Sequence, residues 1–122
     1  MLDLAALRSN LATPLMTLVG GGSTAGDGAQ ATATQIKQPY GVTIGKNGVI
    51  FFAERGSETV RAVLSDGTVR TLAGGGSLAT DGDGPMLDLS QPHDLVVDAN
   101  GDLVFADARS HKVRKVSTRF GL

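Results

Sequence analysis

Short apolar runs separated by glycine-containing turns dominate the pattern of the chain. In residues 49–53 apolar side chains fall on both faces of an extended strand, and residues 103–106 repeat this pattern. Runs of this length, each bounded by turn residues, predict strands rather than helices. The expected strands are residues 41–44, 49–53, 59–64, 68–73, 94–97, 103–106 and 112–117.

The turn residues indicate that consecutive strands are joined by tight hairpins. Asn47-Gly48 and Asn100-Gly101 stand between the first two strands of each group, and Asp66-Gly67 stands between the third and fourth. Asn-Gly favours a type I′ turn because both central residues of that turn need a positive φ. The sequence therefore predicts antiparallel meanders.

An internal repeat relates the two groups of strands. Residues 17–28 are answered by residues 71–82, 54 positions later, and both segments contain Gly-Gly-Gly-Ser and Asp-Gly. Matches such as Val60-Arg61 with Val113-Arg114 follow at a spacing of 53. A meander that is apolar on both faces and repeats at about 50 residues is typical of a β-propeller blade between two neighbours. The predicted fold class is all-β, with two four-stranded antiparallel meander blades of a β-propeller.

The second copy also carries a family resemblance. Residues 92–116, which begin Pro-His-Asp-Leu-Val-Val-Asp, resemble an NHL repeat, and the glycine-rich segments with Asp-Gly fit the same pattern. The resemblance covers residues 15–118, and the first copy departs from it at Glu54 and at residues 57–59. It implies a binding or interaction scaffold. Some NHL-like propellers are lyases with a metal in the central channel, and the surfaces of others bind RNA.

The strand count divides the chain into three parts. Residues 1–14 form an N-terminal segment in which Leu4, Leu7 and Leu11 have helical spacing. Residues 15–70 supply the fourth strand of a preceding blade, Leu15–Val19, and the first complete blade. Residues 71–122 hold an inter-blade loop and a second blade without its fourth strand. A ring needs four to eight blades, so we expect partner blades from a longer protein or from identical chains, of which three would make six blades and four would make eight.

Two groups of residues are candidate ligand contacts. In the first, His93 precedes and Asp94 begins the innermost strand of the second blade, and Tyr40 is the counterpart of His93 in the first blade. In the second, Asp107, His111 and Arg114 occupy the most recognisable positions of the resembling family. A carboxylate facing a histidine and an arginine can bridge two strands, so we expect a structural hydrogen-bonding role for this second group.

The sequence offers candidate ligands for two metal ions, zinc and calcium. Three His93 side chains of a closed trimer would form a catalytic zinc site at the channel mouth. Asp81 and Asp83 could hold calcium weakly, although solvated loop aspartates explain them as well. The sequence shows no nucleophile with its base and orienting group, so a binding scaffold is the leading prediction, and a propeller lyase or metalloenzyme is the alternative.

Charge and composition narrow the remaining partners. The net charge of −1 gives no bulk attraction for nucleic acid, although Lys112, Arg114 and Lys115 on one strand could meet RNA phosphates. Gly-Asp-Gly and Thr-Asp-Gly follow the two Gly-rich segments and disfavour the helix that a dinucleotide site needs. No stretch has the roughly 18 to 20 apolar residues of a membrane span. The chain has no cysteine and no feature that assigns a compartment.

Overall fold

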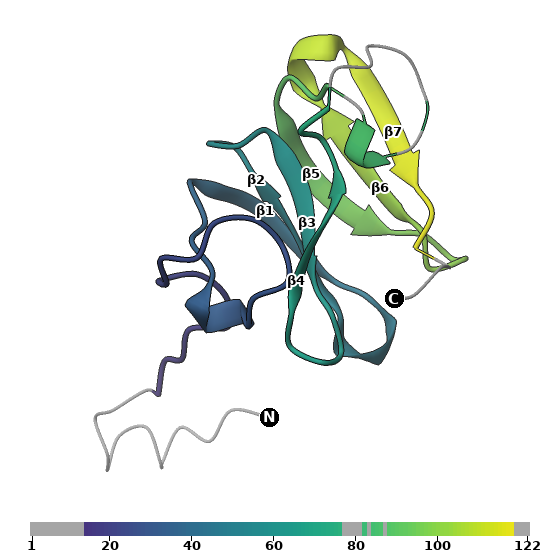
Figure 1. Cartoon of the computed structure of the whole chain (residues 1–122). Coiled ribbons are helices and arrows are strands. Elements are labelled where there is room, and N and C mark those ends of the chain that lie inside the picture. Colours follow the sequence, from purple (N-terminus) through teal and green to yellow (C-terminus); the bar gives the residue numbers. More distant parts are fainter. Residues whose placement is uncertain (1–13, 77–81, 83, 87, 119–122) are drawn as a thin grey trace.

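The computed structural model describes residues 14–76, 82, 84–86 and 88–118, which form two antiparallel sheets (Figure 1). The first sheet has the order β1-β2-β3-β4, and the second has the order β5-β6-β7. Short 3₁₀ turns η1 (Ala31–Ala33), η2 (Lys46–Gly48), η3 (Gly84–Met86) and η4 (Ala108–Ser110) lie between strands. The predicted all-β meanders are confirmed. The strands are β1 (Pro39–Ile44), β2 (Ile50–Glu54), β3 (Thr59–Val63), β4 (Val69–Ala73), β5 (Pro92–Val97), β6 (Leu103–Asp107) and β7 (Lys112–Val116).

The sequence repeat extends to the pairing register. Phe52 pairs with Arg61 in the first sheet, and Phe105 pairs with Arg114 in the second. The first hairpin of each sheet also shifts register at the same place, between Pro39 and Val42 in β1 and between Pro92 and Leu95 in β5. The two sheets are therefore copies of one unit.

A continuous apolar core joins the two sheets. One face of the first sheet and one face of the second contribute to it, and Leu89 from the connection between them is buried there as well. Because strand residues alternate between faces, each sheet uses only one of its two apolar faces here. The largest contributors are Phe51, Val60, Leu72, Leu95, Leu103 and Phe105.

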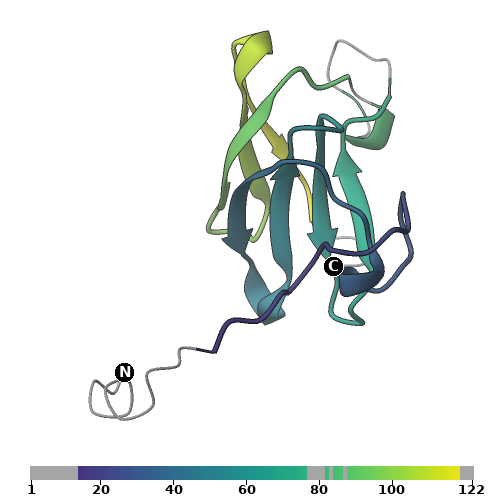
Figure 2. The same cartoon turned by 90° about the vertical axis from the view of Figure 1, so that its left-hand side faces the viewer.

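The opposite face of the first sheet is covered only in part. The leader loop, residues 20–36, crosses it (Figure 2). Ala31 and Ile36 of this loop pack against Phe52 and Val69. Backbone bonds from Gly28 N to Val69 O (2.9 Å) and from Val69 N to Ala29 O (3.1 Å) hold the loop along the outer edge of β4. This pairing protects an edge strand from other chains.

Asp27 of the Asp-Gly element fixes the leader loop to β4. The Asp27 carboxylate accepts hydrogen bonds from Thr71 N and Thr71 Oγ1, both at 2.9 Å. These bonds clamp the loop onto β4. The corresponding Asp81 of the second copy lies outside the described residues, as does Asp83.

Two turn predictions have different outcomes. Asn47 and Gly48 have φ values of 62° and 76°, as a type I′ turn requires. Of the pair Asn100-Gly101 only Gly101 has a positive φ (85°), so the type I′ prediction for this turn is wrong. The Asp98 carboxylate accepts hydrogen bonds from Asn100 N and Asp102 N at 2.9 and 3.0 Å, and these stabilise a turn in which only the glycine is left-handed.

The N-terminal predictions concern residues 1–19. The expected helix falls on residues 1–13, which lie outside the described residues. Leu15–Val19, expected as the fourth strand of another blade, pair with no strand of the described structure, and Leu15, Met16 and Leu18 are exposed. Within the described residues, no helix has the length and apolar character needed to cross a bilayer.

Candidate functional site at the ends of the inner strands

The structure brings Tyr40 and His93 together. They begin the neighbouring strands β1 and β5, and their rings meet edge to face with centroids 4.1 Å apart and planes at 80°. The strands approach closely because Gly41 has no side chain: a Cβ there would lie 2.3 Å from the backbone oxygen of His93. The two predicted counterparts therefore form one surface across the boundary between the sheets.

Charged groups complete this surface. The Arg55 guanidinium lies 5.3 Å from the centre of the Tyr40 ring, within the range of a cation–π contact. The Asp94 side chain is 95% exposed, and its Oδ1 lies 4.0 Å from His93 Nδ1. We call Tyr40, Arg55, His93 and Asp94 the composite surface. Arg55 was missed by the sequence reasoning because it lies in the β2–β3 turn, and its approach to Tyr40 depends on the fold.

The predicted metal ligand has no companions within the part of the chain that the structure describes. No group of three or more His, Cys, Asp or Glu side chains is placed there to hold a metal ion. His93 has an aromatic ring and one distant carboxylate as neighbours. A zinc site at His93 would need ligands from other chains or other blades.

The second predicted group is only partly assembled. Asp107 and Arg114 are both buried, and Asp107 Oδ2 lies 3.5 Å from Arg114 Nη1. His111, by contrast, is exposed and ends η4 with a left-handed φ of 58°. Glu58, at the corresponding position of the first sheet, has a φ of 55°. The position therefore serves a turn in both copies, and the side chain of His111 does not join the buried pair.

Asp107 acts as a structural carboxylate. Its Oδ1 accepts hydrogen bonds from Ser90 N (2.9 Å) and Gln91 N (3.0 Å), which bring the connecting loop into β5. Burial raises the pKa of Asp107, but hydrogen bonds from Gln91, Ser110 and Ser90 and the charge of Arg114 outweigh burial and lower the pKa overall. A carboxylate held ionised in this way is unsuited to act as a general acid.

Two of the three basic residues of β7 lie beside carboxylates. Arg114 is buried against Asp107, and Lys115 Nζ lies 3.4 Å from Asp98 Oδ2 and 4.0 Å from Asp102 Oδ2. Neighbouring carboxylates repel phosphate groups. This arrangement weakens the case for an RNA-binding strand.

Comparison with known proteins agrees with this geometry. Residues 89–116 match the NHL repeat family. No curated protein matches the chain. A structural genomics protein of unknown function from Bacteroides thetaiotaomicron is 26% identical, with a TM-score of 0.66 over 81% of this chain and 26% of that protein.

Two further solved structures share the fold. An auxiliary nutrient binding protein from Bacteroides ovatus is 24% identical, with a TM-score of 0.62 over 75% of this chain and 25% of that protein. Virginiamycin B lyase from Staphylococcus aureus is 19% identical, with a TM-score of 0.52 over 70% of this chain and 25% of the lyase. The chain thus spans about a quarter of the length of the proteins it matches.

Proposed function

Because residues 89–116 are an NHL repeat and the two sheets are blades of a β-propeller, we propose that the chain is a binding module of a larger propeller. Its ligand contacts the composite surface at the ends of the two inner strands. The ligand is a small molecule or an exposed protein segment, and the module itself performs no chemical step.

The contact between Tyr40 and His93 carries this proposal. It joins two blades at the end of their inner strands, where the mouth of a propeller's central channel lies. A half-exposed aromatic ring, an imidazole, a guanidinium and an exposed carboxylate together offer stacking, donor and acceptor groups to one ligand. A protein that shares this fold is described as an auxiliary nutrient binding protein, which is in line with a binding role.

The partners include further blades. The outer edge of β7 bounds a blade of three described strands, whereas the first blade has four. Leu15–Val19 match β4 in sequence, and the glycines that follow have the same backbone: Gly20 and Gly21 have φ values of 94° and 86°, and Gly74 and Gly75 have 91° and 88°. We propose that a segment of this kind, from an identical chain or from the same longer protein, completes the second blade.

A binding screen by NMR tests the ligand site. The ¹⁵N-labelled chain is titrated with aromatic amines, aromatic carboxylates and short basic peptides. The proposal predicts that at least one class shifts the amide signals of Tyr40, Arg55, His93 and Asp94 together, and that Tyr40→Ala removes the effect. Shifts confined to other residues would refute the composite surface.

The alternatives have their own readouts. Stoichiometric Zn²⁺ binding that is lost on His93→Ala would favour the metalloenzyme. RNA affinity that falls steeply with salt and on Lys112→Ala would favour the nucleic-acid surface.

A further inference from the structure

Both asparagines of the described part of the chain are followed by glycine. Asn47 lies between β1 and β2, Asn100 lies between β5 and β6, and both are exposed. An asparagine side chain can lose its amide without an enzyme when the backbone nitrogen of the next residue attacks the side-chain carbonyl carbon. Glycine at the next position favours this attack because it has no Cβ to block the approach. The two dipeptides are identical, so only the structure of each turn separates them.

The reaction needs no co-reactant besides water. The glycine nitrogen loses its proton to solvent and bonds to the asparagine Cγ, and the side-chain nitrogen leaves as ammonia, which closes a succinimide ring. Water then opens the ring at either carbonyl carbon. One opening gives aspartate. The other gives isoaspartate, in which the main chain runs through the former side chain and is longer by a methylene group.

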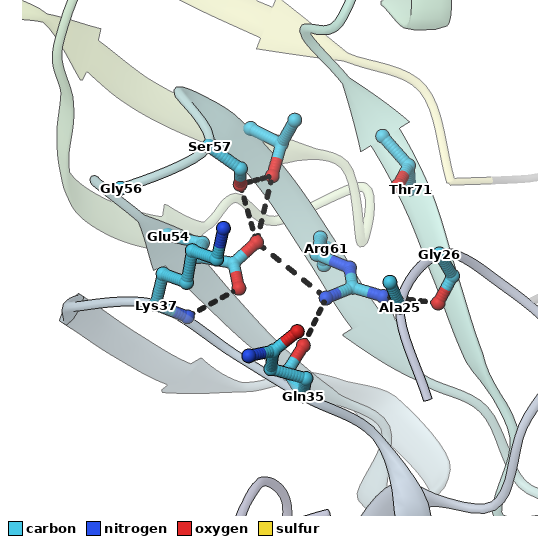
Figure 3. Close-up of a pocket in the computed structure, with 10 residues that line it drawn as sticks. Ala25, Gly26, Gln35, Lys37, Glu54, Gly56, Ser57, Arg61 and Thr71 are labelled. Carbon is cyan, nitrogen blue, oxygen red and sulfur yellow. Dashed lines mark hydrogen bonds and ion pairs between the residues drawn. The ribbon is translucent and has the colours of Figure 1, made fainter. Parts of the chain in front are cut away.

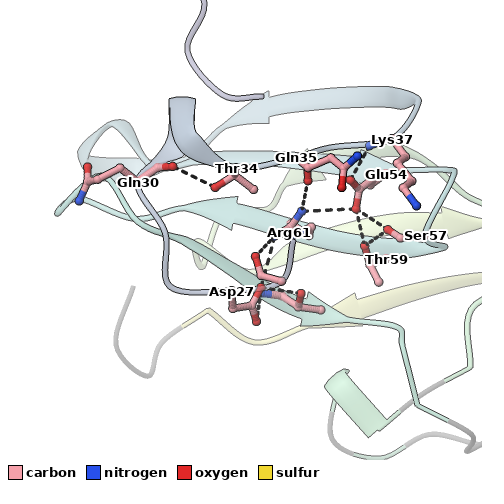
Figure 4. A network of polar contacts seen from close by, with 11 residues as sticks. Asp27, Gln30, Thr34, Gln35, Lys37, Glu54, Ser57, Thr59 and Arg61 are labelled. Atoms are coloured by element: carbon pink, nitrogen blue, oxygen red, sulfur yellow. Dashed lines mark hydrogen bonds and ion pairs between the residues drawn. The ribbon is translucent and has the colours of Figure 1, made fainter. Parts of the chain in front are cut away.

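The glutamine side chains of the described residues are poorer substrates for this reaction. Their amide lies farther from the backbone, so the ring that would form is larger and closes more slowly. Each of them is followed by alanine, isoleucine or proline instead of glycine. Gln35 lines a pocket between the leader loop and the first blade (Figure 3). Gln30 accepts a hydrogen bond from the Thr34 hydroxyl at its backbone oxygen, at 2.9 Å (Figure 4). The asparagines are therefore the amides to compare.

The Asn100-Gly101 turn is held by several short hydrogen bonds. The nitrogen that would attack, Gly101 N, donates to Asp98 O at 3.0 Å, and Asp98 N donates to Asp102 O at 2.9 Å. The Asp98 carboxylate accepts the bonds from Asn100 N and Asp102 N already described, and bonds to an ionised carboxylate are stronger than bonds between neutral groups. The Thr118 hydroxyl also donates to Gly101 O. This turn resists opening.

The Asn47-Gly48 turn is closed less firmly. Gly45 stands at the position of Asp98, so the turn has no carboxylate there to bind its backbone N–H groups. The hydrogen bond across the turn, from Val49 N to Lys46 O, is 3.5 Å long, at the limit for such a bond. Gly45 N donates to Val49 O at 2.8 Å, which pairs the strands at the base of the turn. The tip of the turn can therefore open while the hairpin stays paired.

Opening of the tip is necessary for the attack. Asn47 has a ψ of 21°, which turns the nitrogen of Gly48 away from the Asn47 side chain. The backbone must rotate before this nitrogen and Cγ approach to about 3–3.5 Å, the distance at which bonds form. The rate is then proportional to the population of the open turn. A turn with fewer and longer hydrogen bonds reacts faster.

We propose that Asn47 is a site of spontaneous deamidation and that Asn100, in the same dipeptide, is protected by the turn that Asp98 builds. In the folded chain Asn47 reacts at least about tenfold faster than Asn100, a difference of about 1.4 kcal/mol in the barrier. The product adds a negative charge to a chain whose net charge is −1. Isoaspartate also lengthens the connection to β1, the strand that carries Tyr40 of the composite surface at its other end.

Incubation of the full chain at mildly alkaline pH tests the proposal. Peptide mapping by mass spectrometry, with fragmentation that distinguishes aspartate from isoaspartate, follows both positions over time. We expect both products to accumulate at Asn47 at least about tenfold faster than at Asn100. In urea the two rates should agree within about threefold, because unfolding removes the hydrogen bonds of both turns. Equal rates in the folded chain, or a faster reaction at Asn100, overturn the proposal.

Matched variants test the role of the Asp98 turn. Asp98→Ala removes the carboxylate and should bring the rate at Asn100 to within about threefold of the rate at Asn47. Asp88→Ala, which removes an exposed aspartate outside both turns, should leave both rates unchanged. Thr118→Val removes one hydroxyl bond to the turn and should accelerate Asn100 less than Asp98→Ala does; it serves as the test if circular dichroism shows Asp98→Ala to be unfolded. An unchanged rate at Asn100 in the folded variants contradicts the assignment.

Discussion

The two blades place equivalent residues in opposite surroundings. Val60 is 0% exposed, whereas Val113, its counterpart in the second blade, is 76% exposed; Leu95 is 7% exposed, and its counterpart Val42 is 68% exposed. Each blade therefore buries one face against the other and exposes apolar residues on the opposite face, which in the first blade the leader loop covers only in part. Such head-to-tail stacking is directional and continues until a ring closes. The exposed apolar residues Val42 and Val113 lie where the proposed neighbouring blades would pack.

The largest effect is expected from a substitution that disrupts the interface between the blades. Val60→Asp buries a carboxylate without a partner and should destabilise the chain by more than about 4 kcal/mol. Val113→Asp, the same change on the open face, should stay within about 0.5 kcal/mol. Urea unfolding followed by circular dichroism measures both. Similar losses for the two variants would mean that the second face is also covered in solution.

A second pair of substitutions, with smaller expected effects, compares the buried face of the second blade with the exposed face of the first. Leu95→Ala leaves a cavity between the blades and should cost about 2–5 kcal/mol of the free energy of unfolding. Val42→Ala removes methyl groups that already face solvent and should cost less than about 0.5 kcal/mol. Urea unfolding measures both variants, and at equal m-values the shift of the midpoint gives the loss in the free energy of unfolding. A costly Val42→Ala would show that this face has a partner.

Asp107, the buried carboxylate of the second blade, should make the free energy of unfolding fall at acid pH. The lowered pKa of Asp107 means that its stabilisation is complete above the unfolded-state pKa of about 3.9 and is lost as pH falls through the lower folded-state value. Asp107→Asn should therefore cost about 1.5–3 kcal/mol at pH 7. The difference from wild type should shrink toward pH 2. Asp94→Asn controls for the loss of one exposed carboxylate, and a gap that stays constant with pH would refute the account.

The smallest effect is expected at the two Asn-Gly turns, which have the same sequence and different backbone conformations. Asn47 is left-handed, with φ at 62°, and Asn100 is not. Asn47→Ala should destabilise the chain by about 1 kcal/mol, because asparagine, with its short polar side chain, tolerates the left-handed region better than alanine does. Asn100→Ala should change stability by less than about 0.5 kcal/mol. Thermal unfolding of both variants checks this, and equal shifts would contradict the two turn geometries.

Most of the strand pattern was predictable because its signals are local. Apolar alternation and turn glycines place all seven described strands to within two residues at each end. The Asn100-Gly101 turn escaped this reasoning. At the position where the first copy has Gly45, the second has Asp98, whose carboxylate selects the other turn. A single side chain outside the dipeptide decided the conformation.

The candidate sites were less predictable because they depend on how the blades stack. That Tyr40 and His93 are counterparts was readable from the repeat, but their contact requires the close approach at Gly41. His111 was expected beside Asp107, and its left-handed turn position was not visible in the sequence. The buried ion pairs of Arg61 with Glu54 and of Arg114 with Asp107 left one usable signal, the match of Val60-Arg61 with Val113-Arg114.

The contact between Tyr40 and His93 is the point at which fold and proposed function meet, and a nuclear Overhauser spectrum of the full chain tests it most directly. The account predicts cross-peaks between the two rings, together with cross-peaks from the Val60 methyl groups to residues across the blade interface. Absence of the ring cross-peaks in a folded sample would contradict it, because the composite surface would then not exist.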